Sequence, residues 1–409
     1  MLYPFGIRIA SIWNDKAMLW IKGRKIFPTI DSSAARKETI WMHCASLGEF
    51  EQGHPLIEKI RTEYPGSIII ISFFSPSGYE IEKNNSNADY VFYLPSDSFS
   101  NAKKFIDLLN PTLVLWIKYE YWYYYLKELK KRNIPTLLIS GYFRKDQPFF
   151  KWYRNFWMEM LKCFTYYFLQ NEDSKILLEN LNIKNVAVTG DTRFDRVITI
   201  VENFYDVPLI KEFCGNNKVI VAGSTWEDDE AELLHYAKTN AHIKFIIAPH
   251  EVDIENIRDV KKKFVNSILY SEWVTGNRQP ATGNQQSNCL IIDNIGILSK
   301  LYKYADITYV GGGFGYDGLH NILEAAAYGK PVIFGPEIEK NFEAQELIEC
   351  GGGITIGNAL ELEKTLTDLF NNSDELKNRG IAAKNYVYNN AGATKKIMEY
   401  IQENRLLTN

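Results

Sequence analysis

The chain has 409 residues, a net charge of −4 and a hydrophobic fraction of 46%. This length allows two or three domains with large cores, and the average composition excludes intrinsic disorder and collagen-like repeats. The weakly acidic balance provides no overall basic field for nucleic acid, and no stretch reaches the roughly 18 apolar residues of a membrane-spanning helix. Five widely spaced cysteines without a C-x-x-C pair favour reduced thiols in a cytosolic compartment.

The N-terminal segment, residues 2–25, mixes aromatic and aliphatic side chains with lysines and arginines. Such a mixture is typical of a segment that lies at a bilayer surface, where aromatic rings sit at headgroup level and cations meet anionic lipid. A terminal helix that packs on its own domain has the same composition. The sequence leaves both interpretations open.

Short apolar runs alternate with amphipathic stretches along the first half of the chain. The apolar runs predict strands at residues 39–43, 67–72, 90–93, 112–116, 136–139 and 186–189. The amphipathic stretches predict helices, among them 49–63, 99–109 and 121–132. This alternation predicts a parallel sheet covered by helices on both faces.

Residues 197–217 have weak periodicity and predict a linker, after which the alternation begins again. The predicted strands of the second half are 218–222, 244–248, 290–292, 307–310, 331–334 and 353–356. A polar insert at 275–288 predicts an exposed loop, and 374–389 and 393–404 predict helices. We therefore expect an α/β protein of two doubly wound domains that face a central cleft. Ligands of such sheets bind beyond the carboxyl ends of the strands.

The first candidate site follows the first predicted strand, where residues 43–51 pass through a small turn into a helix. Glu49 in this turn is a candidate general base, provided that its surroundings tune its acidity. A glutamate in the first turn of a helix is also favoured by the helix dipole alone. Position in the sequence does not separate these two roles.

The second candidate site is the glycine-rich segment 311–327, which follows the predicted strand 307–310. Its glycines allow the backbone to approach a ligand, and a helix is expected to begin near His320 and Asn321 with its N–H groups directed to a phosphate. Glu324 could accept hydrogen bonds from ribose hydroxyls. The segment is not a P-loop, because it lacks the G-x-x-x-x-G-K-[ST] pattern. A purely structural turn is the alternative.

Smaller polar signals also follow predicted strands. Ser224 and Thr225 end one strand and supply hydroxyl groups, and Pro249 and His250 end another. Arg193, in the segment 190–195, is a fixed cation that could meet a phosphate or a sugar carboxylate.

Aromatic residues make up 14% of the chain, and many of them are interleaved with lysine and arginine in 116–125 and 142–157. Such segments bind single-stranded nucleic acid or a membrane interface with anionic headgroups. The acidic net charge makes the membrane the better hypothesis. Packing in the core would account for some of these aromatic residues.

Taken together, the motifs resemble those of the 3-deoxy-D-manno-octulosonic acid (Kdo) transferase family of lipopolysaccharide biosynthesis. The segments that carry this resemblance are 46–49, 120–122, 190–195, 222–225 and 312–325, and the match extends over roughly residues 20–390. The resemblance implies a GT-B-type fold of two Rossmann-like domains. Residues 1–200 would bind the acceptor, hold the base and face the membrane. Residues 201–409 would bind the CMP-sugar, with the last helix crossing back to the first domain.

The resemblance also implies an inverting glycosyltransferase that moves Kdo from CMP-Kdo to a lipid A precursor of the lipid IVA type. It would work peripherally or monotopically at the cytoplasmic face of the inner membrane, without nucleic acid, metal or another cofactor. Glu49 matches the catalytic base of the family, and Glu120 and Arg193 match residues proposed to stabilise the transition state. The implied substrate-binding residues are Ser224, Thr225, Pro249, His250, Ile295, Gly296, Ile297, Gly312, Gly313, His320, Asn321, Ile322, Leu323 and Glu324.

The chain departs from the family pattern at Lys118, where an acidic residue is frequent, and at His250, where arginine is frequent. Two other functions stay open. One is a GT-B transferase or an epimerase that uses a UDP-linked sugar. The other is a membrane-peripheral nucleotide-binding protein without turnover, which would have no use for Glu49.

Overall fold

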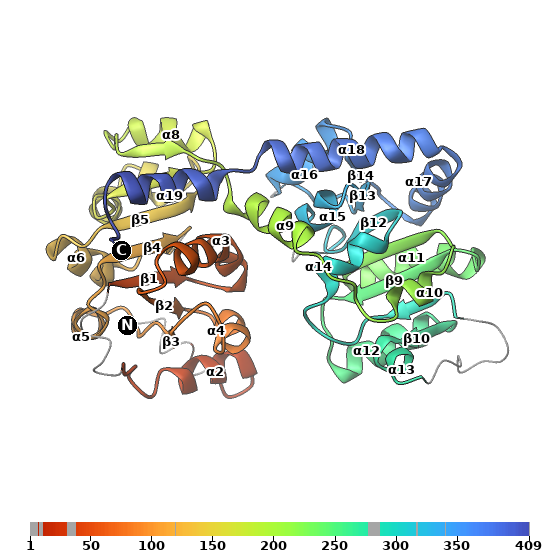
Figure 1. Ribbon diagram of the computed structural model, residues 1–409, viewed down its shortest axis with the longest axis horizontal. Coiled ribbons are helices and arrows are strands. Elements are labelled where there is room, and N and C mark those ends of the chain that lie inside the picture. The colour runs from red at the N-terminus through yellow and green to blue at the C-terminus, as the bar shows by residue number, and fades with distance from the viewer. Residues whose placement is uncertain are drawn as a thin grey trace. The chain divides into compact units, whose positions relative to one another are not determined.

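The structure is a computed structural model that describes residues 7, 11–30, 38–118, 120–276, 287–315, 318–339 and 341–408. The chain divides into two compact units (Figure 1). The first comprises Met1–Arg196 together with Ala391–Asn409, and the second comprises Val197–Asn390. Each unit contains a seven-stranded parallel sheet, which confirms the predicted α/β fold of two doubly wound domains. The roles predicted for the two domains stay predictions.

The strand order of the first sheet is β3-β2-β1-β4-β5-β6-β7. These strands are β1 (Thr39–Cys44), β2 (Ile68–Phe73), β3 (Tyr90–Tyr93), β4 (Leu113–Ile117), β5 (Thr136–Gly141), β6 (Tyr166–Leu169) and β7 (Val186–Val188). The order reverses between β1 and β4, and in open α/β sheets ligands bind beyond the carboxyl ends of the strands at this switch point.

Helices cover both faces of the first sheet (Figure 1). The helical elements of this part of the chain are α2 (Asp15–Gly23), α3 (Leu47–Glu63), α4 (Pro76–Glu82), α5 (Phe99–Leu109), α6 (Tyr123–Lys131), η2 (Pro148–Phe150), α7 (Asn155–Leu161), α8 (Glu172–Glu179) and α19 (Ala393–Glu403), together with α9 (Thr192–Glu202), which begins in the first unit and ends in the second. Successive residues of β1 point to opposite faces, so Trp41 belongs to one apolar cluster and Met42 to the other. Ile397 of α19 packs in the Met42 cluster, which places the last helix within the first unit.

The strand order of the second sheet is β10-β11-β9-β8-β12-β13-β14, and it reverses between β8 and β12. Its strands are β8 (Val219–Thr225), β9 (Lys244–Pro249), β10 (Ser267–Leu269), β11 (Cys289–Ile291), β12 (Ile307–Val310), β13 (Val332–Phe334) and β14 (Gly353–Thr355). The helical elements are α10 (Ile210–Cys214), α11 (Glu227–Thr239), α12 (Ile254–Lys263), α13 (Tyr270–Val274), α14 (Leu298–Leu301), η3 (Tyr302–Tyr304), α15 (Leu323–Ala327), α16 (Phe342–Glu349), α17 (Ala359–Asn371) and α18 (Ser373–Asn389).

The segment 197–217, which was predicted to be a linker, begins at the boundary between the two units, but it contains helical structure. Helix α9 continues to Glu202, and α10 follows after a short break. Val197, Ile210 and Phe213 are buried, because these short helices pack on the units although their periodicity is weak. Most of the insert predicted as an exposed loop, 277–286, lies outside the described residues. Its last two residues, 287–288, are buried, so the prediction is wrong for them.

Helix α2 is docked on the first unit. Trp20 is buried, and the Arg24 guanidinium donates to the carbonyl oxygens of Leu94 at 2.8 Å and Phe74 at 2.7 Å. Ahead of this helix Trp13 is 73% exposed. Residues 1–6 and 8–10, which form much of the segment predicted to meet a membrane, lie outside the described residues. Over the described part of the chain, no helix combines the length and the apolar character needed to cross a bilayer.

Candidate functional site

Glu49 lies in the first turn of α3, directly after the loop that leaves β1. Its side chain is buried, and its Oε2 accepts the N–H of Ala45 at 2.5 Å. This hydrogen bond satisfies a backbone donor that precedes the helix, as a first-turn glutamate often does. The same contact fixes the direction of the carboxylate at the carboxyl edge of the first sheet.

Glu120 follows β4, the neighbour of β1 across the switch point. Its Oε2 accepts the indole N–H of Trp122 at 3.1 Å and lies 3.5 Å from Nε2 of His43. His43 is the fifth residue of β1 and is fully buried. The Glu120 side chain is 24% exposed and is held between the buried His43 and the partly buried Trp122.

Arg193 forms a double hydrogen bond with Asp191, from Nε at 3.0 Å and Nη2 at 2.9 Å. The same Asp191 oxygen accepts amide N–H groups from Gln170 at 2.6 Å and Gln52 at 3.1 Å. Burial raises the pKa of Asp191, but the charges of Arg193 and Lys118 outweigh that effect and hold the pKa below its usual value. Arg193 is thus a cation with a fixed orientation.

The three residues predicted to be catalytic all follow carboxyl ends of strands in the first sheet: β1, β4 and β7. Gln52, one helical turn beyond Glu49, joins α3 to the Asp191–Arg193 pair. Sequence reasoning missed Asp191, Gln52 and Gln170. Asp191 lies inside the recognised segment 190–195, but no spacing indicates the two amides.

The glycine-rich segment of the second unit is anchored by Asp229 in the first turn of α11. Asp229 accepts the N–H of Gly312 at 2.9 Å and the hydroxyl of Tyr309 at 2.7 Å. Gly312 has φ +91°, and a Cβ there would lie 2.3 Å from the carbonyl oxygen of Gly318, so only glycine fits. Burial raises the pKa of Asp229 in spite of these hydrogen bonds. The sequence analysis did not identify this residue.

Trp226, His250 and His320 form a stack of rings at the carboxyl edge of the second sheet. The rings of His250 and His320 lie 4.3 Å apart with an interplanar angle of 19°. The indole of Trp226 lies 4.7 Å from His250 and donates its N–H to Nε2 of His320 at 2.9 Å. The structure therefore brings together His250 and His320, two of the residues predicted to bind the substrate. Trp226 lies with them and was not predicted from the sequence.

The remaining predicted binding residues differ in their exposure. Thr225 is buried and donates to Glu230, and the side chains of Ile322 and Leu323 are buried. Pro249 is buried as the last residue of β9, whereas Ser224 in β8 and Glu324 in α15 are partly exposed. Ile295 is 74% exposed, and Asn321 lies in a loop and donates to Glu324 at 3.1 Å. Helix α15 begins at Leu323 and has five residues. The predicted start near His320 and Asn321 is two to three residues too early, because both residues lie in the loop before the helix.

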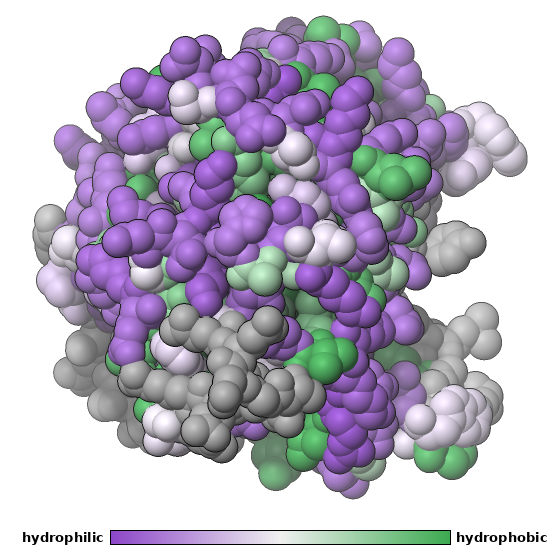
Figure 2. All heavy atoms as spheres, turned by 90° about the vertical axis from the view of Figure 1, so that its right-hand side faces the viewer, coloured by the Kyte–Doolittle hydropathy of each residue, from purple (hydrophilic) through white to green (hydrophobic). Residues whose placement is uncertain are grey.

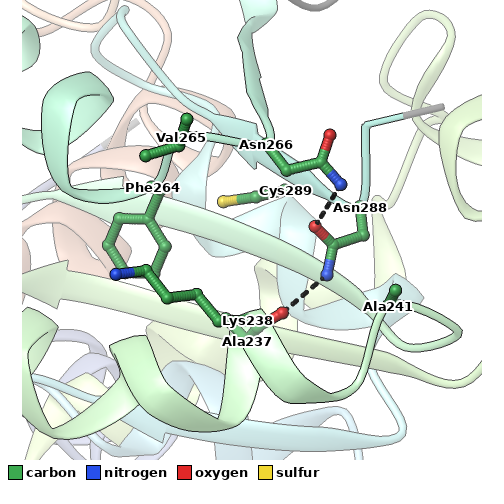
Figure 3. A pocket seen from close by; sticks show the side chains of 8 residues that line it. All are labelled: Ala237, Lys238, Ala241, Phe264, Val265, Asn266, Asn288 and Cys289. Atoms are coloured by element: carbon green, nitrogen blue, oxygen red, sulfur yellow. Dashed lines mark hydrogen bonds between the residues drawn. The ribbon is translucent and has the colours of Figure 1, made fainter. Parts of the chain in front are cut away.

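A separate cavity of about 310 Å³ lies in the second unit, at the start of β11 (Figure 3). Asn266 donates to Asn288, which donates in turn to the carbonyl oxygen of Ala237, so the polar groups of its wall are paired with one another. It contains none of the predicted site residues. The described residues also contain no group of three or more His, Cys, Asp or Glu side chains that could hold a metal ion.

A family model of known proteins matches a range that ends at Arg196, where the main segment of the first unit also ends. The family model described as "3-Deoxy-D-manno-octulosonic-acid transferase (kdotransferase)" matches residues 21–196. A 3-deoxy-D-manno-octulosonic acid transferase of Aquifex aeolicus is 27% identical over 363 residues, 87% of this chain and 92% of that protein. The transferase of the same name from Rickettsia felis is 29% identical over 386 residues, 91% of this chain and 80% of that protein.

A bifunctional glycosyltransferase/methyltransferase of Fusobacterium nucleatum is 27% identical over 83% of this chain, which spans only 54% of that relative. Among solved structures, UDP-GlcNAc 2-epimerase of Neisseria meningitidis has a TM-score of 0.63 at 18% identity, covering 89% of this chain and all of that one. A glycosyltransferase of Rickettsia africae has a TM-score of 0.55 at 19% identity, covering 91% of this chain and all of that one. These structures share the GT-B fold. The resemblance to the Kdo transferase family is confirmed, and the chain is a glycosyltransferase.

Proposed function

We propose that this glycosyltransferase, a relative of the Kdo transferases, moves Kdo from CMP-Kdo to a lipid A precursor with inversion at the anomeric carbon. The observation that carries the proposal is the family match to residues 21–196. The matched range ends at Arg196, the last residue of the segment Met1–Arg196 of the first unit. This segment contains the buried Glu49 and Arg193, whose orientation is held by Asp191.

In the proposed reaction Glu49 takes the proton from an acceptor hydroxyl, whose oxygen forms a bond to the anomeric carbon of Kdo. The bond from that carbon to the phosphate oxygen breaks, and CMP leaves with the electron pair. Arg193, held by Asp191, offers a guanidinium to the negative charge of the sugar carboxylate or the leaving phosphate. Because its orientation is already fixed in the protein, little reorganisation would accompany the charge change.

We assign CMP to the second unit. The turn at Gly312 is compact, because a Cβ there would lie 2.3 Å from the carbonyl oxygen of Gly318, and Asp229 fixes the turn by accepting the Gly312 N–H. At Gly313 a Cβ would lie 2.6 Å from the Gly335 nitrogen, so the second glycine is required by packing within the chain. The ring stack of His250 and His320 offers an aromatic surface and ring nitrogens at this edge. Glu324 would accept hydrogen bonds from the ribose hydroxyls.

We further propose that the protein binds peripherally to the cytoplasmic face of the inner membrane through its first unit. Trp152 is 93% exposed, and Tyr153 and Phe156 are exposed beside it, with Arg154 in the same stretch. Such a mixture of aromatic and basic groups suits anionic headgroups. Figure 2 shows that one face of the second unit is mostly hydrophilic, with scattered apolar residues.

The test is incubation of the purified protein with CMP-Kdo and a lipid A precursor, followed by mass spectrometry of the lipid and analysis of the released nucleotide. The proposal requires a lipid carrying added Kdo and an equal amount of CMP. Glu49→Gln serves as the inactive control. Turnover of a UDP-linked sugar with release of UDP would replace the proposal by the UDP alternative. Binding of CMP without any transfer would favour a nucleotide-binding protein.

A further inference from the structure

Trp226 is the N-cap residue of α11, at the point where the chain passes from β8 into this helix. Its main-chain N–H donates at 2.9 Å to Oδ2 of Asp229, the oxygen that also accepts the N–H of Gly312. Its indole N–H donates to Nε2 of His320 at 2.9 Å. The start of α11 therefore holds the glycine-rich segment at two points, one at Gly312 and the other at His320.

His320 lies in the loop before α15, so no helix or strand orients its side chain. Its main-chain N–H donates to the carbonyl oxygen of Gly311 at 3.1 Å, which fixes the backbone but not the rotamer of the imidazole. The imidazole stacks on the ring of His250 at 4.3 Å, and stacking by itself allows the ring to turn within its own plane. The hydrogen bond from Trp226 adds a direction, because an indole N–H can only donate and needs Nε2 as its acceptor.

We propose that Trp226 is a positioning residue, which holds His320 in the orientation in which its imidazole contacts the donor nucleotide. The inference rests on the proposed function, which assigns CMP to this edge of the second sheet. Trp226 is partly buried and also stacks on His250 at 4.7 Å, so its own place is set by α11 and by the end of β9. A side chain that is oriented before the ligand arrives loses less conformational entropy on binding. The affinity for CMP should therefore depend on the indole N–H.

A double-mutant cycle on CMP affinity tests this role. Trp226→Phe keeps an aromatic ring beside His250 and removes the donor, whereas His320→Phe keeps a ring and removes the acceptor. Calorimetry should find that Trp226→Phe weakens CMP binding by about 3-fold to 10-fold, which is the usual net effect of one hydrogen bond. In the His320→Phe background the same change should have no further effect, because the hydrogen bond is already absent.

The matched control is Trp273→Phe. The indole of Trp273, in the same unit, donates to the carbonyl oxygen of Leu209 at 3.1 Å, so this change also removes one indole hydrogen bond but should leave CMP affinity unchanged. An affinity of Trp226→Phe equal to that of the control would overturn the proposal. So would an effect of Trp226→Phe that is equally large with and without the His320 imidazole, since a general loss of stability adds in this way.

The hydrogen bond itself is tested by NMR of the full chain with nitrogen-15 in its nine tryptophans. One indole N–H proton signal should move upfield in His320→Phe, because that proton loses its acceptor, and the same signal should be missing from Trp226→Phe. The measurement also serves where Trp226→Phe fails to fold, since the shift needs only the His320→Phe variant. Indole signals that all keep their positions in His320→Phe would overturn the proposal.

The two proposals fail in different ways. If the unaltered protein binds CMP but the cycle shows no coupling between Trp226 and His320, the positioning role is refuted and the proposed function stands. If the unaltered protein does not bind CMP, the assignment of the nucleotide to the second unit is refuted, and the role of Trp226 in nucleotide binding with it. The NMR result then decides only whether the indole donates to His320.

Discussion

Asp191→Asn should destabilise the first unit by about 3–5 kcal/mol, the usual cost of removing one partner of a buried ion pair. Asp191 is 4% exposed, and its Oδ2 accepts from Arg193, Gln170 and Gln52. Every one of these partners is a donor. An asparagine amide in the same place would bring a further donor against them or leave the guanidinium with a weaker, neutral acceptor.

The loss should depend on pH with a definite sign. Burial raises the pKa of Asp191, but Arg193 and Lys118 outweigh it, so the pKa in the folded protein lies below that in the unfolded chain. The unfolded chain therefore binds more protons as the solution becomes acidic. The stabilisation from Asp191 is fully present above its unfolded pKa of about 3.9, and it is lost as the pH falls through the folded pKa. Asparagine does not titrate, so the difference between the two proteins should shrink in acid.

Urea unfolding followed by circular dichroism, at pH 7 and at steps below about pH 4, measures both effects. The chain offers a matched control in Asp146→Asn, since Asp146 pairs with Arg144 at the same two-residue spacing, 3.3 Å apart. Their side chains are 71% and 55% exposed, so the loss there should stay below about 1 kcal/mol. An Asp191→Asn loss as small as that of the control, or one constant with pH, would refute the reasoning.

Four further outcomes are expected. Glu49→Gln should lower turnover by about 100-fold or more while calorimetry finds CMP affinity unchanged; a near-normal rate would contradict its role as base. Glu324→Ala should weaken CMP binding by about 1–3 kcal/mol in calorimetry, and an unchanged affinity would reassign the carboxylate to its contact with Asn321. Asp195 accepts the N–H groups of Gly392 at 2.6 Å and Thr394 at 2.7 Å, so Asp195→Ala should cost about 0.5–2 kcal/mol in thermal or urea unfolding, and an unchanged midpoint would argue against this cap. Trp152→Ala should reduce flotation with anionic liposomes, and high salt should weaken the binding of the unaltered protein; equal recovery with neutral vesicles would exclude the electrostatic part.

The fold could be predicted because its signals are local. The run 68–71 consists of isoleucines, which indicates a strand buried on both faces, and β2 lies there. The amphipathic stretch 99–109 predicts a helix with the bounds that α5 has. The helices in 197–217 could not be predicted, since short helices such as α10 are stabilised by the residues they pack against and show little periodicity of their own.

Part of the candidate site could also be predicted from local sequence signals. Glu49, Glu120 and Arg193 follow strand ends that the alternation of apolar runs already indicated, and their chemistry is a property of the residue types. The buried partners were not predicted. Gln52 and Asp191 are 139 positions apart, and no spacing in the sequence connects them.

The sequence by itself determined the succession of strands and helices, because hydrophobic periodicity is set by neighbouring residues. Only the tertiary structure decided which polar groups meet. Parallel strands distant in the chain end at one edge of a sheet, and there burial forces each donor to find an acceptor. That requirement joins His43 to Ser72, Asp191 to Arg193 and the turn at Gly312 to Asp229. Two of these three pairs are far apart in sequence, and they are set by strand order and register, which no local pattern records.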